Sequence, residues 1–329
     1  MSEEFDLKKA HQENSKSKTA VSHQNQEVPP TQGTKFLEDL SLHEIAKEFT
    51  EFGQQGRHTI VPIGFPQAGK SLLLSSLMYY ARKGKETLFK VNLENDFPFN
   101  NGRKTVDNMI KAFDEKRLFG ANAKGSLDLI GIDIVPTKPK LPTLKLAFLD
   151  LAGEDIKNIK TSEESAFTEK INAVFNGLQV VKSPIIFSLI TPFEPAKKDG
   201  ETSQDAHNRE DALHYDFLNY IEKNQPNLKR QCKFFIIVSQ WDKNPNENQS
   251  IEEYIRTKRP SIYAYVKNSQ VVWGQYSVGL LLESKEDGIN YQSIVRINHD
   301  YPSRFWKKLY QICTGKNLDQ KTFLQKIFG

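Results

Sequence analysis

The sequence lacks several features that mark common classes of protein. Its 329 residues include only two cysteines, which provide neither a disulfide framework nor a metal-binding spacing. No apolar run approaches the length of a membrane-spanning helix, so we expect no membrane span. The chain is polar from its first residues, so we expect no signal peptide and, by default, a cytoplasmic protein.

The chain also lacks a large excess of either positive or negative charge. Lysine and arginine total 45 against 41 acidic residues, and no basic run is interleaved with aromatic residues. Nucleic acid is therefore not an expected partner. His207 and His214 fall in one expected helix, and we interpret them as solvated or capping side chains rather than metal ligands.

The composition changes along the chain and divides it into three parts. Residues 1–34 are rich in charged and amide side chains, which predicts a disordered polar tail or an arm that folds on a partner. Residues 35–57 carry apolar side chains at helical spacing and predict an amphipathic lead-in helix, packed on the next domain or bound to a partner. Residues 58–329 form the main domain, with C-terminal amphipathic helices over 302–328.

Apolar runs alternate with helical patterns in the main domain. The two runs at 127–135 and 144–149 are separated by prolines and predict a hairpin. Purely apolar runs, as at 234–238, are typical of a sheet buried on both faces. We therefore predict an α/β, three-layer fold with a mainly parallel sheet of about six strands and helices on both faces. Strands are expected at 58–63, 127–135, 144–149, 185–190, 234–238 and 271–278.

The first strand leads into a loop whose spacing is specific to phosphate binding. Gly64, Gly69, Lys70 and Ser71 match the pattern G-x-x-x-x-G-K-[ST] of a P-loop NTPase. Such a loop points backbone N–H groups at phosphates, and the helix that follows adds the positive end of its dipole. We expect Lys70 to reach the β- and γ-phosphates and the Ser71 hydroxyl to bind Mg²⁺. The expected nucleotide-binding residues are Gly64, Gln67, Ala68, Gly69, Lys70, Ser71 and Leu72.

Two aspartates follow buried strands, at the edge of the sheet where a nucleotide would lie. Asp150 begins the sequence Asp-Leu-Ala-Gly-Glu, and we expect it to hold Mg²⁺ through water while the N–H of Gly153 contacts a γ-phosphate. Asp242 can accept two hydrogen bonds from the N1–H and the exocyclic amine of guanine, a pair of donors that adenine lacks. For each aspartate the alternative is an ordinary turn after a strand.

With these three motifs in order, the chain resembles a P-loop GTPase of the Ras-like, translation-factor-related class over about residues 58–280. Ser239-Gln240-Trp241-Asp242 is similar to the guanine-reading motif through its aspartate. Tyr276-Ser277-Val278-Gly279 resembles the loop whose backbone contacts the guanine oxygen. The resemblance implies that Gln240, Asp242, Ser277 and Val278 bind the base. Long separations between the motifs and an enlarged first-switch region, over about 83–125, resemble the bacterial double-GTPase families.

The chain departs from that family's pattern at several positions. Gln240 replaces the lysine that lies along the base. Glu154 occupies the place of the glutamine that orients water, so the implied catalytic residues are Lys70, Gly153 and Glu154. No threonine directly precedes the strand at 127–135, and Ser126 or Thr105 is left as the first-switch candidate. No arginine finger is assigned, although Arg103 and Arg117 lie nearby in the sequence.

These residues together predict a guanine-nucleotide-binding switch protein with slow Mg²⁺-dependent GTP hydrolysis. Protein partners would contact the switch region or the N-terminal tail. One alternative is a nucleotide-binding interaction or scaffold subunit with little or no hydrolysis. A P-loop ATPase or kinase is the other alternative, and Leu151 disfavours the ATPase because an acidic residue commonly follows the aspartate there.

Overall fold

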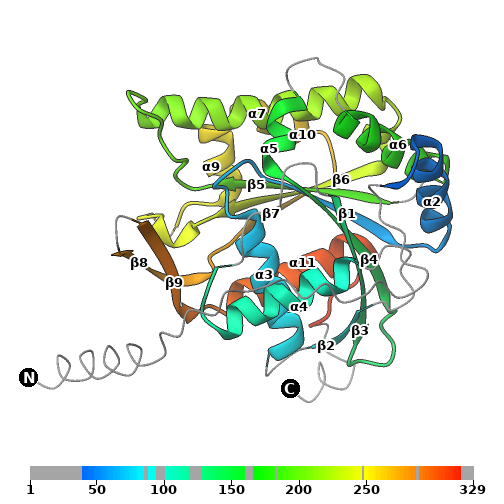
Figure 1. Ribbon diagram of the computed structural model, residues 1–329, viewed down its shortest axis with the longest axis horizontal. Coiled ribbons are helices and arrows are strands. Elements are labelled where there is room, and N and C mark those ends of the chain that lie inside the picture. Colours follow the sequence, from blue (N-terminus) through cyan, green and yellow to red (C-terminus); the bar gives the residue numbers. More distant parts are fainter. Residues whose placement is uncertain are drawn as a thin grey trace, which may run out of the picture. The chain divides into compact units, whose positions relative to one another are not determined.

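The computed structural model describes residues 39–84, 88–93, 101–118, 127–159, 166–181, 184–246, 248–286 and 289–319 (Figure 1). The tail expected over residues 1–34 lies outside these ranges, as does most of the last amphipathic segment, residues 318–328. Ser126, one of the two first-switch candidates, also lies outside them.

A seven-stranded sheet forms the centre of the described domain (Figure 1). Its strands are β1 (His58–Ile63), β2 (Phe89–Leu93), β3 (Leu127–Pro136), β4 (Leu144–Leu151), β5 (Ile185–Pro192), β6 (Cys232–Ser239) and β7 (Val271–Gln275). Their spatial order is β2-β3-β4-β1-β5-β6-β7. The pairs from β4 to β7 are parallel, whereas β2–β3 and β3–β4 are antiparallel. The predicted hairpin of β3 and β4 is therefore confirmed.

Helices cover both faces of this sheet. They are α2 (Leu42–Gln54), α3 (Lys70–Lys83), α4 (Asn101–Asp114), α5 (Gly153–Asn158), α6 (Ala166–Val180), α7 (Ser203–Asn224), α8 (Leu228–Gln231), α9 (Ile251–Lys258), α10 (Pro260–Val266) and α11 (Asp300–Thr314). The helices α2, α5, α6, α7, α9 and α10 pack on one face, and α3, α4 and α11 on the other (Figure 1). The predicted three-layer α/β fold is confirmed, and it is the fold of a P-loop NTPase.

The central strands are buried on both faces, as their apolar sequences predict. Every residue of β5 is buried, and in β6 only Lys233 is partly exposed. Side chains that alternate along these strands enter two separate cores, one under each layer of helices. Because both faces are covered, a ligand can reach these strands only at their ends. The carboxyl ends of β1, β4, β5 and β6 are where ligands bind in such sheets.

Pro62 lies within the central strand β1, where a proline is normally excluded because it lacks an N–H. In a parallel ladder alternate residues bond to opposite neighbours, and the Thr59 N–H donates to β5 at Pro184 O. The backbone nitrogen of Pro62 therefore points toward β4. The pairing of β1 with β4 ends at Ile60, so Pro62 removes no ladder hydrogen bond.

Two regions of the fold differ from the sequence expectation. The described part of 83–125 contains strand β2 and helix α4, so the sheet has seven strands rather than six. Strand β2 was missed because it has only five residues and lies at the edge of the sheet, where Lys90 and Asn92 are exposed. A separate two-stranded sheet, β8 (Gly279–Glu286) and β9 (Ile289–Ile297), follows β7, which ends at Gln275 instead of Val278.

Helix α2 packs beside α6 on the outer layer. Its start is fixed by a capping box, in which Glu44 N–H donates to Ser41 Oγ and Ser41 N–H donates to the Glu44 carboxylate at 2.8 Å. Ile45, Phe49 and Phe52 are buried in the core that α6 shares. The segment before β1 thus contributes to the same hydrophobic core as the sheet.

Candidate functional site

The P-loop connects the end of β1 to the first residue of α3. The chain turns at Ala68, whose N–H donates to Phe65 O at 3.0 Å. Gln67 and Gly69 both have a positive φ, 72° and 80°, a conformation that is costly for the glutamine side chain and free for glycine. The first N–H groups of α3, including those of Ser71 and Leu72, have no acceptor within the helix. The loop therefore has the curved backbone and free helix amides that phosphate binding requires.

Lys70 joins the P-loop to β4. Its ammonium donates to the Asp150 carboxylate and to the carbonyl oxygen of Leu151. Both side chains of this ion pair are buried, Lys70 at 6% exposure and Asp150 at 0%. The structure thus brings together the lysine of the P-loop motif and the aspartate of the second motif.

Gly153 places the second motif directly against the P-loop backbone. A Cβ atom at this position would lie 2.8 Å from Gly64 O and 3.3 Å from Pro66 N, which is closer than side chains approach. Only glycine therefore allows the start of α5 to meet the loop at this distance. Glu154 follows in the first turn of α5, and its side chain lies outside the described part of the structure.

A second carboxylate lies next to Asp150 on the sheet. Asp128 of β3 is directly opposite Asp150 in the antiparallel ladder, so the two side chains share one face. Thr105 of α4, the other first-switch candidate, donates its hydroxyl to Asp128 Oδ2 at 3.3 Å. Thr105 therefore lies at this edge of the sheet, although in sequence it is far from the strand it was expected to precede.

Magnesium prefers oxygen ligands from carboxylates, hydroxyls and phosphates. Asp150 offers a carboxylate at the end of β4, and Ser71 offers a hydroxyl in the first turn of α3, next to the lysine that contacts Asp150. This donor set fits Mg²⁺. Within the described ranges, no group of three histidine, cysteine or acidic side chains is arranged to hold a metal ion.

The segment after β6 is tied to the P-loop by its first residue. Ser239 is buried, and its hydroxyl donates to Ala68 O at 2.7 Å. Gln240 has a positive φ of 56° and begins the short 3₁₀ turn Trp241–Lys243. Trp241 is buried there, while the Asp242 carboxylate is exposed beside the loop. The turn thus presents the aspartate that the sequence assigns to the base.

The loop after β7 completes this edge. Trp241 N–H donates to Tyr276 O at 3.1 Å, and the buried Tyr276 hydroxyl is hydrogen-bonded to Ser76 of α3. Burial raises the pKa of Tyr276, so the phenol stays neutral. In the same loop, Ser277 is buried and Val278 is half-buried. The two expected base-binding segments therefore meet each other and the P-loop helix.

Tyr301 of α11 flanks the base-binding segments. Its ring lies 6.1 Å from that of Tyr276, and the Arg304 guanidinium lies 5.8 Å above it. Burial, and then the charge of Asp242, raise the pKa of Tyr301. Sequence reasoning did not select Tyr301, because only the β8–β9 insertion followed by α11 brings it to this position.

The expectation that the two histidines of α7 are solvated or capping side chains is wrong. His207 and His214 are buried at 4% and 0% exposure rather than solvated. His207 Nδ1 contacts the Arg259 guanidinium at 2.6 Å, and His214 Nδ1 contacts Glu210 O at 3.0 Å. The His214 ring also packs edge-on against Phe65 of the P-loop. No sequence pattern signalled these contacts, because they join α7 to the P-loop and to the junction of α9 and α10, which are far apart in the chain.

Arg117, one of the two arginines near the first switch, does not join the site. Arg117 is exposed and pairs with Glu115, two residues away. The only fully buried arginine among the described residues is Arg259, which donates to Thr191 Oγ1 at 2.8 Å and Pro192 O at 3.0 Å. Arg259 therefore anchors the end of β5 to α10, and it is not accessible to a ligand.

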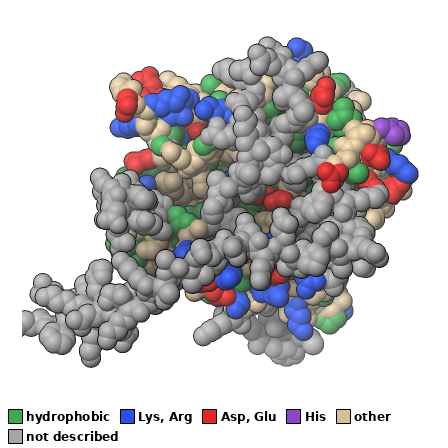
Figure 2. Space-filling model, in the orientation of Figure 1, with side chains coloured by type: hydrophobic (Ala, Val, Ile, Leu, Met, Phe, Trp, Pro, Cys, Tyr) green, Lys and Arg blue, Asp and Glu red, His purple; other side chains and the backbone are tan. Residues whose placement is uncertain are grey.

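None of the described helices combines the length and apolar character required to cross a membrane. On the face drawn in Figure 2, acidic and basic side chains of the described residues are intermingled.

Comparisons with known proteins give structural neighbours only. No protein-family model matches the chain, and no curated protein is similar to it in sequence. Toc33 from Arabidopsis thaliana, in complex with Mg²⁺ and GMPPNP, is 11% identical with a TM-score of 0.37, covering 85% of this chain and 96% of that one.

A dimerization-deficient mutant of Toc33 gives 12% identity and a TM-score of 0.36, with the same coverage of 85% and 96%. A putative nucleolar GTP-binding protein 1 from Plasmodium falciparum gives 15% identity and a TM-score of 0.30, covering 67% of this chain and 77% of that one. These TM-scores are all below 0.5. The function proposed for this chain therefore depends on its own residues and not on these neighbours.

Proposed function

We propose that this protein binds guanine nucleotides and acts as a switch with slow Mg²⁺-dependent GTP hydrolysis. The observation that carries the proposal is the meeting of three motifs at one edge of the sheet. Lys70 of the P-loop pairs with Asp150, Gly153 packs on Gly64 O, and Ser239 donates to Ala68 O. A P-loop, a strand-end aspartate and a base-reading segment in mutual contact favour nucleotide binding over three unrelated turns.

The phosphates would lie on the loop and the first turn of α3. Lys70 now holds Asp150, so nucleotide binding requires its ammonium to move from that carboxylate to the phosphate oxygens. Ser71 and Asp150 would hold Mg²⁺, which neutralises charge that develops on the phosphate oxygens during transfer. The N–H of Gly153 would sense the γ-phosphate, since Gly153 already touches the loop backbone.

Guanine would be selected by Asp242. The exposed carboxylate can accept two hydrogen bonds from the base, while Gln240, Ser277 and Val278 would line the base site. An adenine base offers neither of these two donors to the carboxylate. Because hydrogen bonds to a charged group are strong, their loss would make adenine nucleotides bind much more weakly than guanine nucleotides.

Three features favour slow rather than fast hydrolysis. Glu154 occupies the position of the glutamine that orients water. Its carboxylate would be repelled by the γ-phosphate, whereas a neutral side chain would not. Thr105 is hydrogen-bonded to Asp128, which orients it toward a carboxylate of the sheet. Arg117 is paired with Glu115, and Arg259 is buried. These features equally suit the second candidate, a nucleotide-bound interaction subunit in the cytoplasm whose partners contact the switch region or residues 1–34.

The test is competition of GDP, GTP and ATP against a fluorescent guanine nucleotide bound to the full chain with Mg²⁺. We expect GDP and GTP to displace the probe and ATP to leave it bound. Equal competition by ATP would overturn guanine selection and favour a P-loop ATPase. Retention of full binding by Lys70→Ala would overturn the site itself.

Hydrolysis separates the switch from the interaction subunit. We expect purified protein to release phosphate from GTP slowly, and Ser71→Ala to lose that activity because Mg²⁺ loses a ligand. Tight GTP binding with no release above background would instead identify the interaction subunit.

A further inference from the structure

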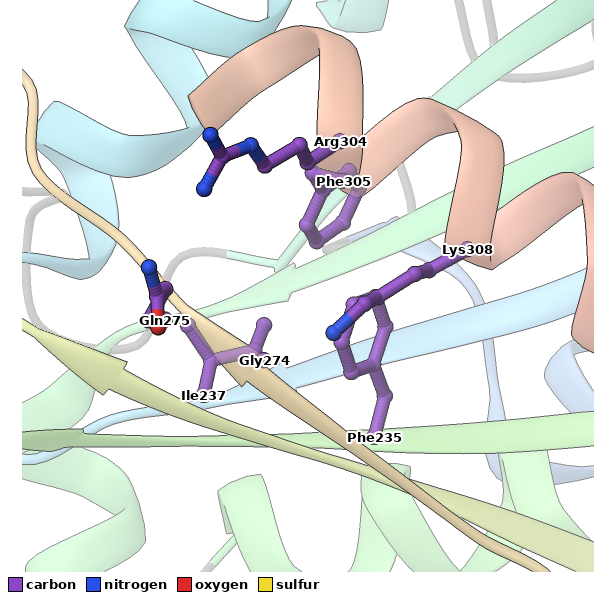
Figure 3. Close-up of a pocket in the computed structure, with 7 residues that line it drawn as sticks. All are labelled: Phe235, Ile237, Gly274, Gln275, Arg304, Phe305 and Lys308. Carbon is purple, nitrogen blue, oxygen red and sulfur yellow. The ribbon is translucent and has the colours of Figure 1, made fainter. Parts of the chain in front are cut away.

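A groove lies between the edge strand β7 and helix α11 (Figure 3). It contains a hollow of about 150 Å³. Its floor is apolar: the Phe235 ring stacks on Phe305 at 5.0 Å and covers Gly274, where a Cβ atom would lie 2.6 Å from that ring. The residues that line this β7–α11 groove are Phe235, Ile237, Gly274, Gln275, Arg304, Phe305 and Lys308.

The outer edge of β7 faces this groove with backbone groups that bond to no described strand, although the carbonyl oxygen of Trp273 accepts a hydrogen bond from Lys308 Nζ. Phe234 N–H donates to Gln270 O, and Tyr276 N–H donates to Val238 O, so the even-numbered residues of β7 bond to β6. The odd-numbered residues, Trp273 and Gln275 among them, therefore point their N–H and C=O groups away from the sheet. No described strand pairs with β7 on that side.

Two cations from α11 line the groove. Arg304 and Lys308 are one helical turn apart and extend from α11 on either side of Phe305 (Figure 3). Lys308 Nζ donates to Trp273 O, and desolvation, together with repulsion from Arg304, lowers the pKa of Lys308. Among the described residues, neither cation has a carboxylate within ion-pair distance, whereas the neighbouring Lys307 pairs with Asp319 at 2.9 Å.

This combination is electrostatically unfavourable without a partner. Two like charges line one groove over an apolar floor, and both desolvation and the charge of Arg304 disfavour the charged form of Lys308. An anion in the groove would remove the repulsion. The hollow is too small for a nucleotide or a large cofactor, because 150 Å³ is the size of a cavity that holds a benzene ring. It accommodates one side chain.

We propose that the β7–α11 groove binds an extended segment of a partner protein, which adds to the outer edge of β7, inserts an apolar side chain into the hollow and places an acidic side chain against Arg304 and Lys308. Strand addition supplies the backbone hydrogen bonds, and side chains two residues apart on the added strand face the same way, about 7 Å apart. One such side chain enters the hollow while the next reaches the cations. The proposal involves none of the nucleotide-binding residues.

The test is fluorescence anisotropy of a labelled, amidated peptide in which threonine alternates with valine and glutamate, titrated with the full chain. We expect saturable binding that weakens at least tenfold in Arg304→Gln and in Lys308→Gln. Lys307→Gln, on the same helix but outside the groove, is the matched control and should bind like the parent chain. The same peptide with glutamine in place of glutamate should bind at least tenfold more weakly.

A backbone variant separates strand addition from charge attraction alone. Gln275→Pro removes an N–H that points away from the sheet, so the fold keeps its ladder while the edge loses a donor. We expect this variant to lose peptide binding with an unchanged melting temperature. The proposal is overturned if the peptide does not bind the parent chain, if Arg304→Gln binds it equally, or if Gln275→Pro leaves the affinity unchanged.

Discussion

The hydroxyl of Ser239 donates a hydrogen bond of 2.7 Å to the carbonyl oxygen of Ala68, joining the end of β6 to the P-loop. Both residues are buried, so this bond is shielded from water. It directs the Ala68 carbonyl toward β6 and so holds the orientation of the loop backbone. The segment after β6 and the P-loop are therefore coupled through the side chain of Ser239.

Replacing Ser239 with alanine tests this coupling. We expect Ser239→Ala to lose about 1 kcal/mol of stability and to weaken guanine-nucleotide affinity severalfold, because the buried Ala68 carbonyl loses its donor. Ser188→Ala is the control: Ser188 is also buried on a neighbouring strand, but its hydroxyl has no hydrogen-bond partner among the described residues. Urea unfolding and nucleotide titration would measure both effects. Equal behaviour of the two variants would contradict the coupling.

The buried ion pair of Lys70 and Asp150 predicts a non-additive pair of mutations. Lys70→Met removes the cation from a buried carboxylate, and we expect a loss of about 3–5 kcal/mol in unfolding free energy. The double variant Lys70→Met/Asp150→Asn should recover much of that loss, because no charge is left buried. Lys83→Met, in an exposed pair with Asp114, should change stability by about 0.5 kcal/mol or less. A double variant no more stable than Lys70→Met would refute this reading of the pair.

The proposed selection of guanine by Asp242 predicts a change in affinity that is confined to guanine nucleotides. Asp242→Asn replaces one acceptor oxygen with a donor, so one of the two bonds to guanine becomes a repulsive contact. We expect GTP affinity to fall by about 100-fold, corresponding to about 3 kcal/mol for charged hydrogen bonds, with ATP binding unchanged. The neighbouring Lys243→Gln should leave both affinities unchanged. A parallel loss for GTP and ATP would show that Asp242 does not read the base.

The buried His207 predicts a loss of stability in mild acid. Desolvation, followed by the charge of Arg259, lowers the pKa of His207 from 6.5 to about 4. Below pH 6.5 the unfolded chain takes up a proton that the folded chain accepts only near pH 4, so stability falls as the pH falls through this window. The maximum loss from this group is about 3 kcal/mol.

Urea unfolding at pH 7, 6 and 5 would measure this dependence. His207→Gln keeps a hydrogen-bond acceptor for Arg259 and should have a shallower decline of stability with falling pH. His43→Gln, at an exposed position of α2, is the control and should follow the parent chain. An unchanged slope in His207→Gln would exclude this histidine as the cause.

Apolar periodicity was sufficient to predict most of the fold. The runs that became β5 and β6 are buried on both faces, so their sequences admit few alternatives to a central strand. Pro260 lies at the first position of α10, where a missing N–H removes no helical bond, so α9 and α10 are separate helices on either side of Arg259. Strand β2 and the hairpin of β8 and β9 were missed, because short or half-exposed strands lack a strong apolar signal.

The sequence by itself determined the P-loop and the order of the three motifs, because the G-x-x-x-x-G-K-S spacing and the strand-end aspartates are local patterns. Only the tertiary structure decided which residues contact these motifs: Ser239 bonds to the Ala68 carbonyl, Asp128 lies opposite Asp150, and the ring of Tyr301 lies beside that of Tyr276. These contacts join residues far apart in the chain. They depend on strand register and helix packing, which a local pattern does not specify.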